Sequence, residues 1–166
     1  MSHYWNAFAE IIATPFEHAA LIWGIVPLYF GLLLNELTAD KANFRTAIQT
    51  GFSFIWAAAH WLYPYFQAGG RGRPWVEVGP MLPIQFVVTF LVLGLGLLAL
   101  VSGFAKRYPK YCRFLGHTRF ANYFMIAIFP MQARALEWTW DRLIVTAIFA
   151  VPVWLALHFG FMPLRK

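Results

Sequence analysis

The sequence predicts an all-α fold, a polytopic bundle of transmembrane helices, and three observations support it. Apolar residues make up 60% of the 166 residues and charged residues only 12%, unlike a water-soluble protein. The range 78–105 contains no charged residue over 28 positions, which is long enough for a helix to cross a bilayer. The basic residues, which give a net charge of +6, lie beside the apolar stretches. Because a soluble domain of this size cannot cover so much apolar surface, most of it must face lipid or other proteins.

The first 13 residues are too polar to span a bilayer, but their apolar side chains follow a helical spacing. Tyr4, Phe8, Ile11 and Ile12 fall on one face of a helix. We therefore expect a short N-terminal helix that lies in the membrane interface or packs on the spans of the same chain.

The first span is predicted over about 15–35. Thr14, Pro15 and Glu17 have the spacing of a capping box, which would start the helix at Pro15. Pro27 lies near the middle of this span and has no backbone N–H. We therefore expect a kink there and a backbone carbonyl without its helical donor.

The second and third spans are predicted over about 47–66 and 81–105. The second is interrupted by polar side chains, namely Gln49, Thr50, Ser53 and His60. In the third, Gly96, Ala99 and Gly103 recur at i, i+3 and i+7, which makes a smooth stripe for close packing by another helix or subunit.

The fourth and fifth spans are predicted over about 119–136 and 143–161. The uncharged part of the fourth, 120–133, has only 14 residues, about 21 Å of helix, which is short for a crossing. The bundle therefore has five spans, or four if 120–133 is re-entrant or interfacial. Pro152 is expected to kink the last span. All of these elements belong to one integral membrane domain, 1–166.

Orientation follows from the positions of lysine and arginine. With the N-terminus outside and five spans, the cytoplasmic segments carry nine basic residues and the external segments carry four; the four-span arrangement gives the same tally. The positive-inside rule thus predicts a cell-membrane protein with its N-terminus outside and the basic loop 106–119 in the cytoplasm. Anionic lipid headgroups are the expected partners of this loop. The side of the C-terminus depends on whether 120–133 crosses.

His60 is the foremost candidate for a ligand-binding site, together with Trp56 and Trp61. A histidine at membrane depth can ligate a metal or haem, relay a proton or bind a substrate, although it can also be hydrogen-bonded at an aromatic interface. Glu17 and His18 are expected at the same external end, where a metal site with His60 is conceivable. Because the capping box already gives Glu17 a structural task, we predict no metal and no cofactor.

A second concentration of aromatic and charged residues includes Arg134, Trp138 and Trp140. These side chains suit contact with a lipid headgroup or a partner subunit, and they also suit a plain interfacial anchor.

The sequence contains no catalytic, nucleotide-binding or metal-ligand motif, which argues against an enzyme. The placement of the basic residues argues against a nucleic-acid partner. The first hypothesis is a non-catalytic subunit or scaffold of a larger or self-assembled membrane complex. The second is a small transporter or channel for a lipid-like or small neutral molecule. The third is a membrane-embedded enzyme or cofactor carrier that uses Glu17, His18 and His60.

Overall fold

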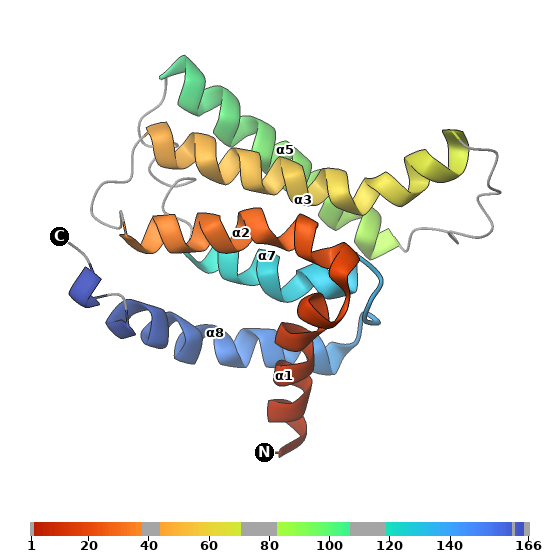
Figure 1. Cartoon of the computed structure of the whole chain (residues 1–166), viewed down its shortest axis with the longest axis vertical. Helices are drawn as coiled ribbons and strands as arrows, with labels where there is room; N and C mark the ends of the chain where they lie inside the picture. The colour runs from red at the N-terminus through yellow and green to blue at the C-terminus, as the bar shows by residue number, and fades with distance from the viewer. Residues whose placement is uncertain (1, 38–43, 71–82, 107–118, 161, 165–166) are drawn as a thin grey trace.

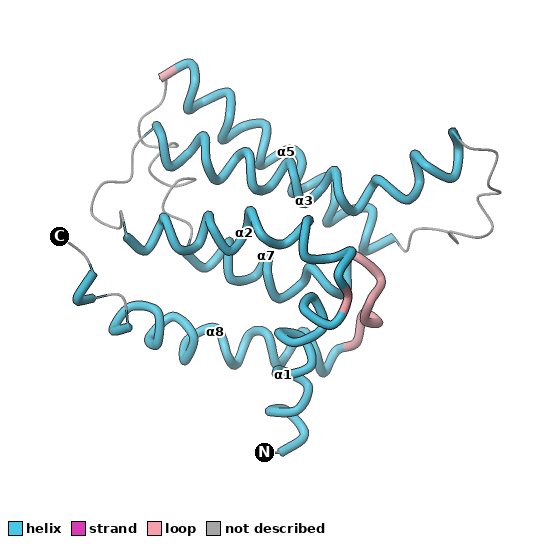
Figure 2. Tube along the Cα trace, viewed as in Figure 1, coloured by secondary structure: helices cyan, strands magenta, loops and turns pink. Residues whose placement is uncertain are grey.

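The computed structural model describes residues 2–37, 44–70, 83–106, 119–160 and 162–164, and within these ranges it contains helices and short loops only (Figure 2). The predicted all-α class is therefore confirmed. Most of the basic loop 106–119 lies outside the described residues. The helices are α1 (Ser2–Glu17), α2 (Ala19–Leu37), α3 (Phe44–Gly70), α5 (Pro83–Ala105), α7 (Arg119–Gln132), α8 (Trp140–Gly160) and the short 3-10 helix η1 (Met162–Leu164).

Five helices run roughly along one direction and α1 lies across them (Figure 1). α3 packs against both α5 and α2, while α7 contacts α2, α1, α8 and α3. The starts of α2, α5 and α8 lie at the same end as the ends of α3 and α7 (Figure 1). Consecutive helices of the bundle therefore run in opposite directions.

α5 and α8 are long and apolar enough to cross a membrane, and α1 with α2 would add a third candidate if counted as one bent span. Both helices present large apolar side chains on their outer faces, such as Phe90 and Val101 on α5 and Ile148 on α8. The polar side chains of α5, Gln85, Thr89 and Ser102, are buried instead. This inside-out pattern is typical of a membrane-associated protein.

α7 lies inside the bundle. Most of its described side chains are buried, from Asn122 to Gln132. The Tyr123 hydroxyl donates a hydrogen bond of 2.8 Å to the carbonyl of Thr146 on α8. Because other helices rather than lipid surround α7, its 14 residues need no wide apolar face of their own.

The predicted capping box at Thr14 is wrong. α1 continues through Thr14 and Pro15 to Glu17, and the Thr14 hydroxyl donates to the Glu10 carbonyl at 2.7 Å. This local bond uses the same side chain that would have capped a new helix. The chain turns at His18 instead, where α1 and α2 meet at 109°, so the long helix that follows begins at Ala19.

α1 packs on helices of its own chain, which is one of the two arrangements left open by the sequence. The Phe8 ring stacks on Phe149 of α8 with centroids 4.3 Å apart. Glu10 pairs with Arg142 of α8 at 3.1 Å. An apolar and a charged contact thus hold α1 across the start of α8.

The glycine stripe of α5 is occupied by α3 of the same chain. A Cβ added at Gly51 would lie 2.7 Å from the Gly96 carbonyl oxygen, and one added at Gly96 would lie 3.1 Å from the Gly51 oxygen. A Cβ added at Gly103 would lie 2.9 Å from the Phe44 carbonyl oxygen. Glycine is required at these positions because the two backbones touch, and Ala99, buried on the same face, completes the contact.

Candidate functional site

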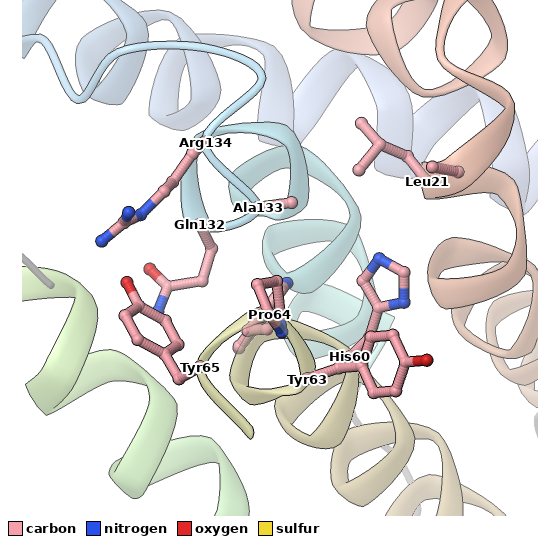
Figure 3. A pocket seen from close by; sticks show the side chains of 10 residues that line it. Leu21, His60, Tyr63, Pro64, Tyr65, Gln132, Ala133 and Arg134 are labelled. Atoms are coloured by element: carbon pink, nitrogen blue, oxygen red, sulfur yellow. The ribbon is translucent and has the colours of Figure 1, made fainter. Parts of the chain in front are cut away.

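A cavity of about 310 Å³ opens between α2, α3 and the end of α7, and we call it the His60 pocket (Figure 3). Such a volume is at the lower end of the range for small-molecule sites. Its polar and aromatic lining consists of His60, Trp61, Tyr63 and Tyr65 from α3 and Gln132 and Arg134 from the end of α7. On the α2 side the wall is apolar, with Ala20 and Leu21. The pocket therefore combines an apolar wall with a polar one.

The position of His60 depends on a glycine of α2. A Cβ at Gly24 would lie 2.6 Å from the His60 Cγ and would also clash with the Phe129 ring. Without it, the His60 ring packs 5.4 Å from the buried Phe129 ring, centroid to centroid, and lies on the Leu21 side of the pocket (Figure 3). Pro64, one turn later, has no N–H to donate to the His60 carbonyl.

Gln132 is held by polar groups of α5. Its Nε2 donates to the Gln85 carbonyl at 2.6 Å and to the Thr89 hydroxyl at 2.6 Å. The Gln85 side chain in turn donates to the Met131 carbonyl at 3.3 Å. These bonds orient the Gln132 amide, so its nitrogen is committed to α5 while its oxygen is not.

Three polar atoms of the lining are buried and have no hydrogen-bond partner among the described residues. They are the Trp61 Nε1, the Tyr65 hydroxyl and the Gln132 Oε1. Trp61 is 3% exposed and Gln132 is 4% exposed. Leaving such atoms unpaired costs about 1–3 kcal/mol each. A polar ligand in the pocket would remove this cost.

Arg134 occupies an unusual backbone position at the end of α7. Its φ is 64°, its N–H donates to the Met131 carbonyl at 3.2 Å, and the Ala135 N–H donates to the Pro130 carbonyl at 2.9 Å. These bonds form a Schellman motif, whose left-handed residue is usually glycine. An arginine there costs about 1 kcal/mol of backbone strain. Its guanidinium carbon lies 5.0 Å from the centroid of the Tyr65 ring.

The predicted site residues separate into different places. His60 and Trp61 meet in the pocket, and Arg134 joins them from α7. Trp56 lies outside the lining and donates to the Trp23 carbonyl at 2.8 Å. This is the carbonyl that Pro27 leaves without a helical donor, so the freed carbonyl expected from the sequence is confirmed.

Glu17 and His18 are exposed at the corner between α1 and α2 and do not line the pocket. Within the described part of the chain, no group of three His, Cys, Asp or Glu side chains is arranged to hold a metal ion. The structure therefore does not bring Glu17, His18 and His60 together as a metal site.

Trp138 and Trp140 lie beside the start of α8, away from the pocket lining. Trp140 is 80% exposed, and the Thr139 hydroxyl accepts from the Arg142 N–H at 3.4 Å, as an N-cap does. This cap starts α8 at Trp140, earlier than the predicted 143. The Arg142 guanidinium also donates to the Glu137 carbonyl at 2.7 Å, so this cluster organises the turn and α1.

A second group of buried polar atoms lies farther from the pocket, and its α7 member, Asn122, comes two turns before Phe129. Asn122 is 0% exposed, and neither atom of its amide has a partner in the described ranges. The same holds for the Thr50 hydroxyl and the Gln49 Nε2 on α3. A Cβ at Gly31 of α2 would lie 3.1 Å from the Ser53 Oγ and 3.6 Å from the Asn122 Nδ2. Ser53 of α3 and Asn122 of α7 therefore both approach Gly31 of α2.

Gln132, Tyr65 and Asn122 are absent from the sequence-based candidates. Their signal was weak, because each is one neutral polar side chain in an aromatic or apolar run. Isolated polar residues in apolar spans are nevertheless expected to face the bundle interior.

Comparisons of the chain with protein-family models, curated proteins and solved structures found no significant match. The functional argument therefore depends on the geometry of the pocket.

Proposed function

We propose that the chain is a multi-pass protein of the cell membrane in which α2, α3, α5, α7 and α8 each cross the bilayer. The alternating directions of these helices support this topology, as does the collection of basic residues at the ends joined by 106–119. The N-terminus is then outside, and α1 lies in the outer interface with Tyr4 and Trp5 exposed. Loop 106–119 contacts anionic headgroups of the cytoplasmic leaflet.

The single cysteine provides a test of this topology. A membrane-impermeant maleimide should label Cys112 in inside-out vesicles and leave it unlabelled in intact cells. In a Cys112→Ser background, Glu137→Cys should show the opposite pattern, because α7 separates the two positions. Labelling of both cysteines from the same side would contradict a crossing by α7, and a full reversal would contradict the orientation.

We further propose that the protein transports a small lipid-like molecule that enters through the His60 pocket. The observation that carries this proposal is the distribution of unpaired buried polar atoms, in the pocket lining and farther along α3 and α7. Trp61 and Gln132 line the pocket, whereas Asn122 lies two turns before Phe129 on α7 and Thr50 lies nearly three turns before His60 on α3. Keeping such groups in a membrane bundle is costly, so a passing polar group that binds them gives a physical reason for their presence.

The polar residues of α3 support a route between these two places. Thr46, Gln49, Thr50, Ser53 and His60 follow each other at helical spacing, so they share the face of α3 that meets α2 and α7. Phe129 packs against both His60 and Trp61, with centroids 5.4 and 5.7 Å away. Phe129 thus closes the pocket from the inner polar group in this conformation.

Movement of a lipid headgroup across liposomes tests the transport proposal. With phosphatidylglycerol carrying an NBD-labelled acyl chain, the reconstituted protein should let external dithionite quench more than the outer-leaflet fraction. His60→Ala should return quenching to that fraction while the protein stays folded, because the lining loses its imidazole. Trp56→Phe is the matched control, since Trp56 lies on the same helix outside the lining. Equal quenching by the wild type and His60→Ala would refute a role for the pocket.

A second candidate is a non-catalytic subunit or scaffold, alone or in a self-assembled complex. It is favoured by the wide apolar faces of α5 and α8. In the most apolar 18-residue stretch of each helix, only 28% of α5 and 17% of α8 is buried within the chain. Extraction in a mild detergent followed by mass measurement should then give an assembly larger than one 19.1 kDa chain. A lone monomer at every concentration, with intact lipid movement, would favour transport alone.

A further inference from the structure

The chemistry of the His60 pocket identifies the class of molecule that it takes, an inference that rests on the proposed function. Two of the lining atoms without a partner among the described residues are donors, the Trp61 indole N–H and the Tyr65 hydroxyl, and the third, the Gln132 Oε1, is an acceptor. Arg134 adds a positive charge to the lining. Among the described residues that line the pocket there is no Asp or Glu. Such a wall favours a ligand with several acceptor oxygens and a negative charge.

The placement of the donors also indicates where the charged group lies. In Figure 3 two donors, the Arg134 guanidinium and the Tyr65 hydroxyl, are on one side of the pocket, and Leu21 and the His60 ring are on the other. A ligand that fits both sides has an anionic head and an apolar tail. The tail lies against Leu21 and Ala20 of α2.

The backbone at Arg134 provides an independent argument. A glycine at this left-handed position would end α7 with the same hydrogen bonds and without the strain of a side chain at φ 64°. Strained residues persist where the side chain has a use that the rest of the fold supports. Here the strained residue places its guanidinium over the Tyr65 ring of the pocket lining, 5.0 Å from the centroid. Because Trp61 is almost completely buried, this donor is preorganised by the core and not by the ligand.

We propose that the His60 pocket binds the anionic oxygen headgroup of an amphiphile, with Arg134, Tyr65 and Trp61 as donors and α2 as the wall for its alkyl chain. Carboxylate and phosphate headgroups share this chemistry, and both occur on single-chain lipids. Arg134 then selects the charge of the headgroup. His60 contributes to the apolar side through its packing on Phe129.

Four probes of equal chain length separate the effect of the headgroup from that of the tail. Laurate, dodecyl phosphate, 1-dodecanol and dodecyltrimethylammonium are titrated into the full chain in nanodiscs of zwitterionic lipid, and saturable binding is followed by native mass spectrometry. Laurate and dodecyl phosphate should bind at least tenfold more tightly than 1-dodecanol, and the ammonium should bind most weakly. Laurate and dodecyl phosphate differ in charge and in the number of acceptor oxygens, so the one that binds more tightly shows which headgroup the donors match better.

A matched pair of variants assigns the charge preference to Arg134. Arg134→Gly and Lys106→Gly each remove one positive charge at a left-handed residue, with φ of 64° and 49°, and neither is expected to unfold the chain. Lys106 follows α5 at the opposite end of the bundle (Figure 1). Arg134→Gly should weaken the binding of both anions at least tenfold and leave the affinity for 1-dodecanol unchanged. Lys106→Gly should change the affinity for each of these three probes by no more than twofold.

The outcomes also separate this inference from the function on which it rests. Saturable binding of all four probes with no preference for anions would overturn the anionic class while leaving a lipid-binding pocket. Equal losses in Arg134→Gly and Lys106→Gly would show that the preference is a general charge effect and would overturn the role of Arg134. Failure of every probe to bind saturably would overturn the proposed function itself.

Discussion

The contact between α3 and α5 is the part of the fold that can be tested most quantitatively. A Cβ at Gly51 would lie 2.7 Å from both the Gly96 oxygen and the Leu100 nitrogen, and 3.1 Å from the Leu100 Cα. All three are backbone atoms, so no side chain can rotate away and one helix must move. Overpacking of this kind costs about 1–3 kcal/mol. Gly51→Ala should therefore destabilise the protein.

Gly94→Ala is the control for the intrinsic preference of alanine for a helix. Gly94 also lies inside a helix of this pair, but a Cβ there would meet nothing within 4 Å. Both substitutions gain about 1 kcal/mol of helix propensity, so this term cancels in the comparison. Gly51→Ala should then be about 1–3 kcal/mol less stable than Gly94→Ala.

The difference can be measured from unfolding of the purified protein by SDS in mixed micelles, at two protein concentrations. A difference that is independent of concentration is expected, because the contact lies within one chain. Equal stability of Gly51→Ala and Gly94→Ala would refute the close approach of α3 and α5. A difference that vanishes on dilution would mean that the glycine stripe joins two chains.

Three other substitutions test particular contacts, each by its effect on the free energy of unfolding. Trp56→Phe should lower the free energy of unfolding by about 1 kcal/mol, because the Trp23 carbonyl loses its donor. Adding Pro27→Ala to Trp56→Phe should recover part of this loss, because alanine, unlike proline, has a backbone N–H that can donate to the same carbonyl. Additive effects of the two substitutions in the double variant would contradict this shared acceptor. Arg134→Gly should be about 1 kcal/mol more stable than Arg134→Ala, which keeps the left-handed strain; no difference would exclude the Schellman motif. Asn122→Leu should stabilise the chain by about 1–3 kcal/mol and slow lipid movement, since it removes an unpaired buried amide; a destabilised variant with full transport would contradict both expectations.

Several features follow from short-range patterns, and these could be predicted from the sequence. The charge-free stretch around α5 requires an apolar helix whatever surrounds it, because lipid offers no partner for an open backbone. Pro27 must leave the Trp23 carbonyl without its helical donor, since proline has no N–H. The helical spacing of Gly96, Ala99 and Gly103 likewise indicates a closely packed face.

Other features depend on contacts between distant parts of the chain. Thr14 had the right neighbours for a cap, yet its hydroxyl bonds to Glu10 while α1 packs on α8, a contact that no local pattern reveals. The glycine stripe could have served a partner subunit until α3 was seen to occupy it. His60 and Trp61 are neighbours in sequence, but their meeting with Gln132 and Arg134 depends on how the end of α7 packs against α2 and α3.

Sequence alone determined that this chain is helical, that its long apolar helices suit lipid, and which polar or small side chains interrupt those helices. These properties depend on residues within a few turns of each other. Only the tertiary structure decided which of these unusual side chains share a cavity, and that α7 is largely buried among the other helices. The reason is that hydrophobic and hydrogen-bonding periodicity acts along one helix, whereas a pocket requires the rotation and depth of three helices relative to one another.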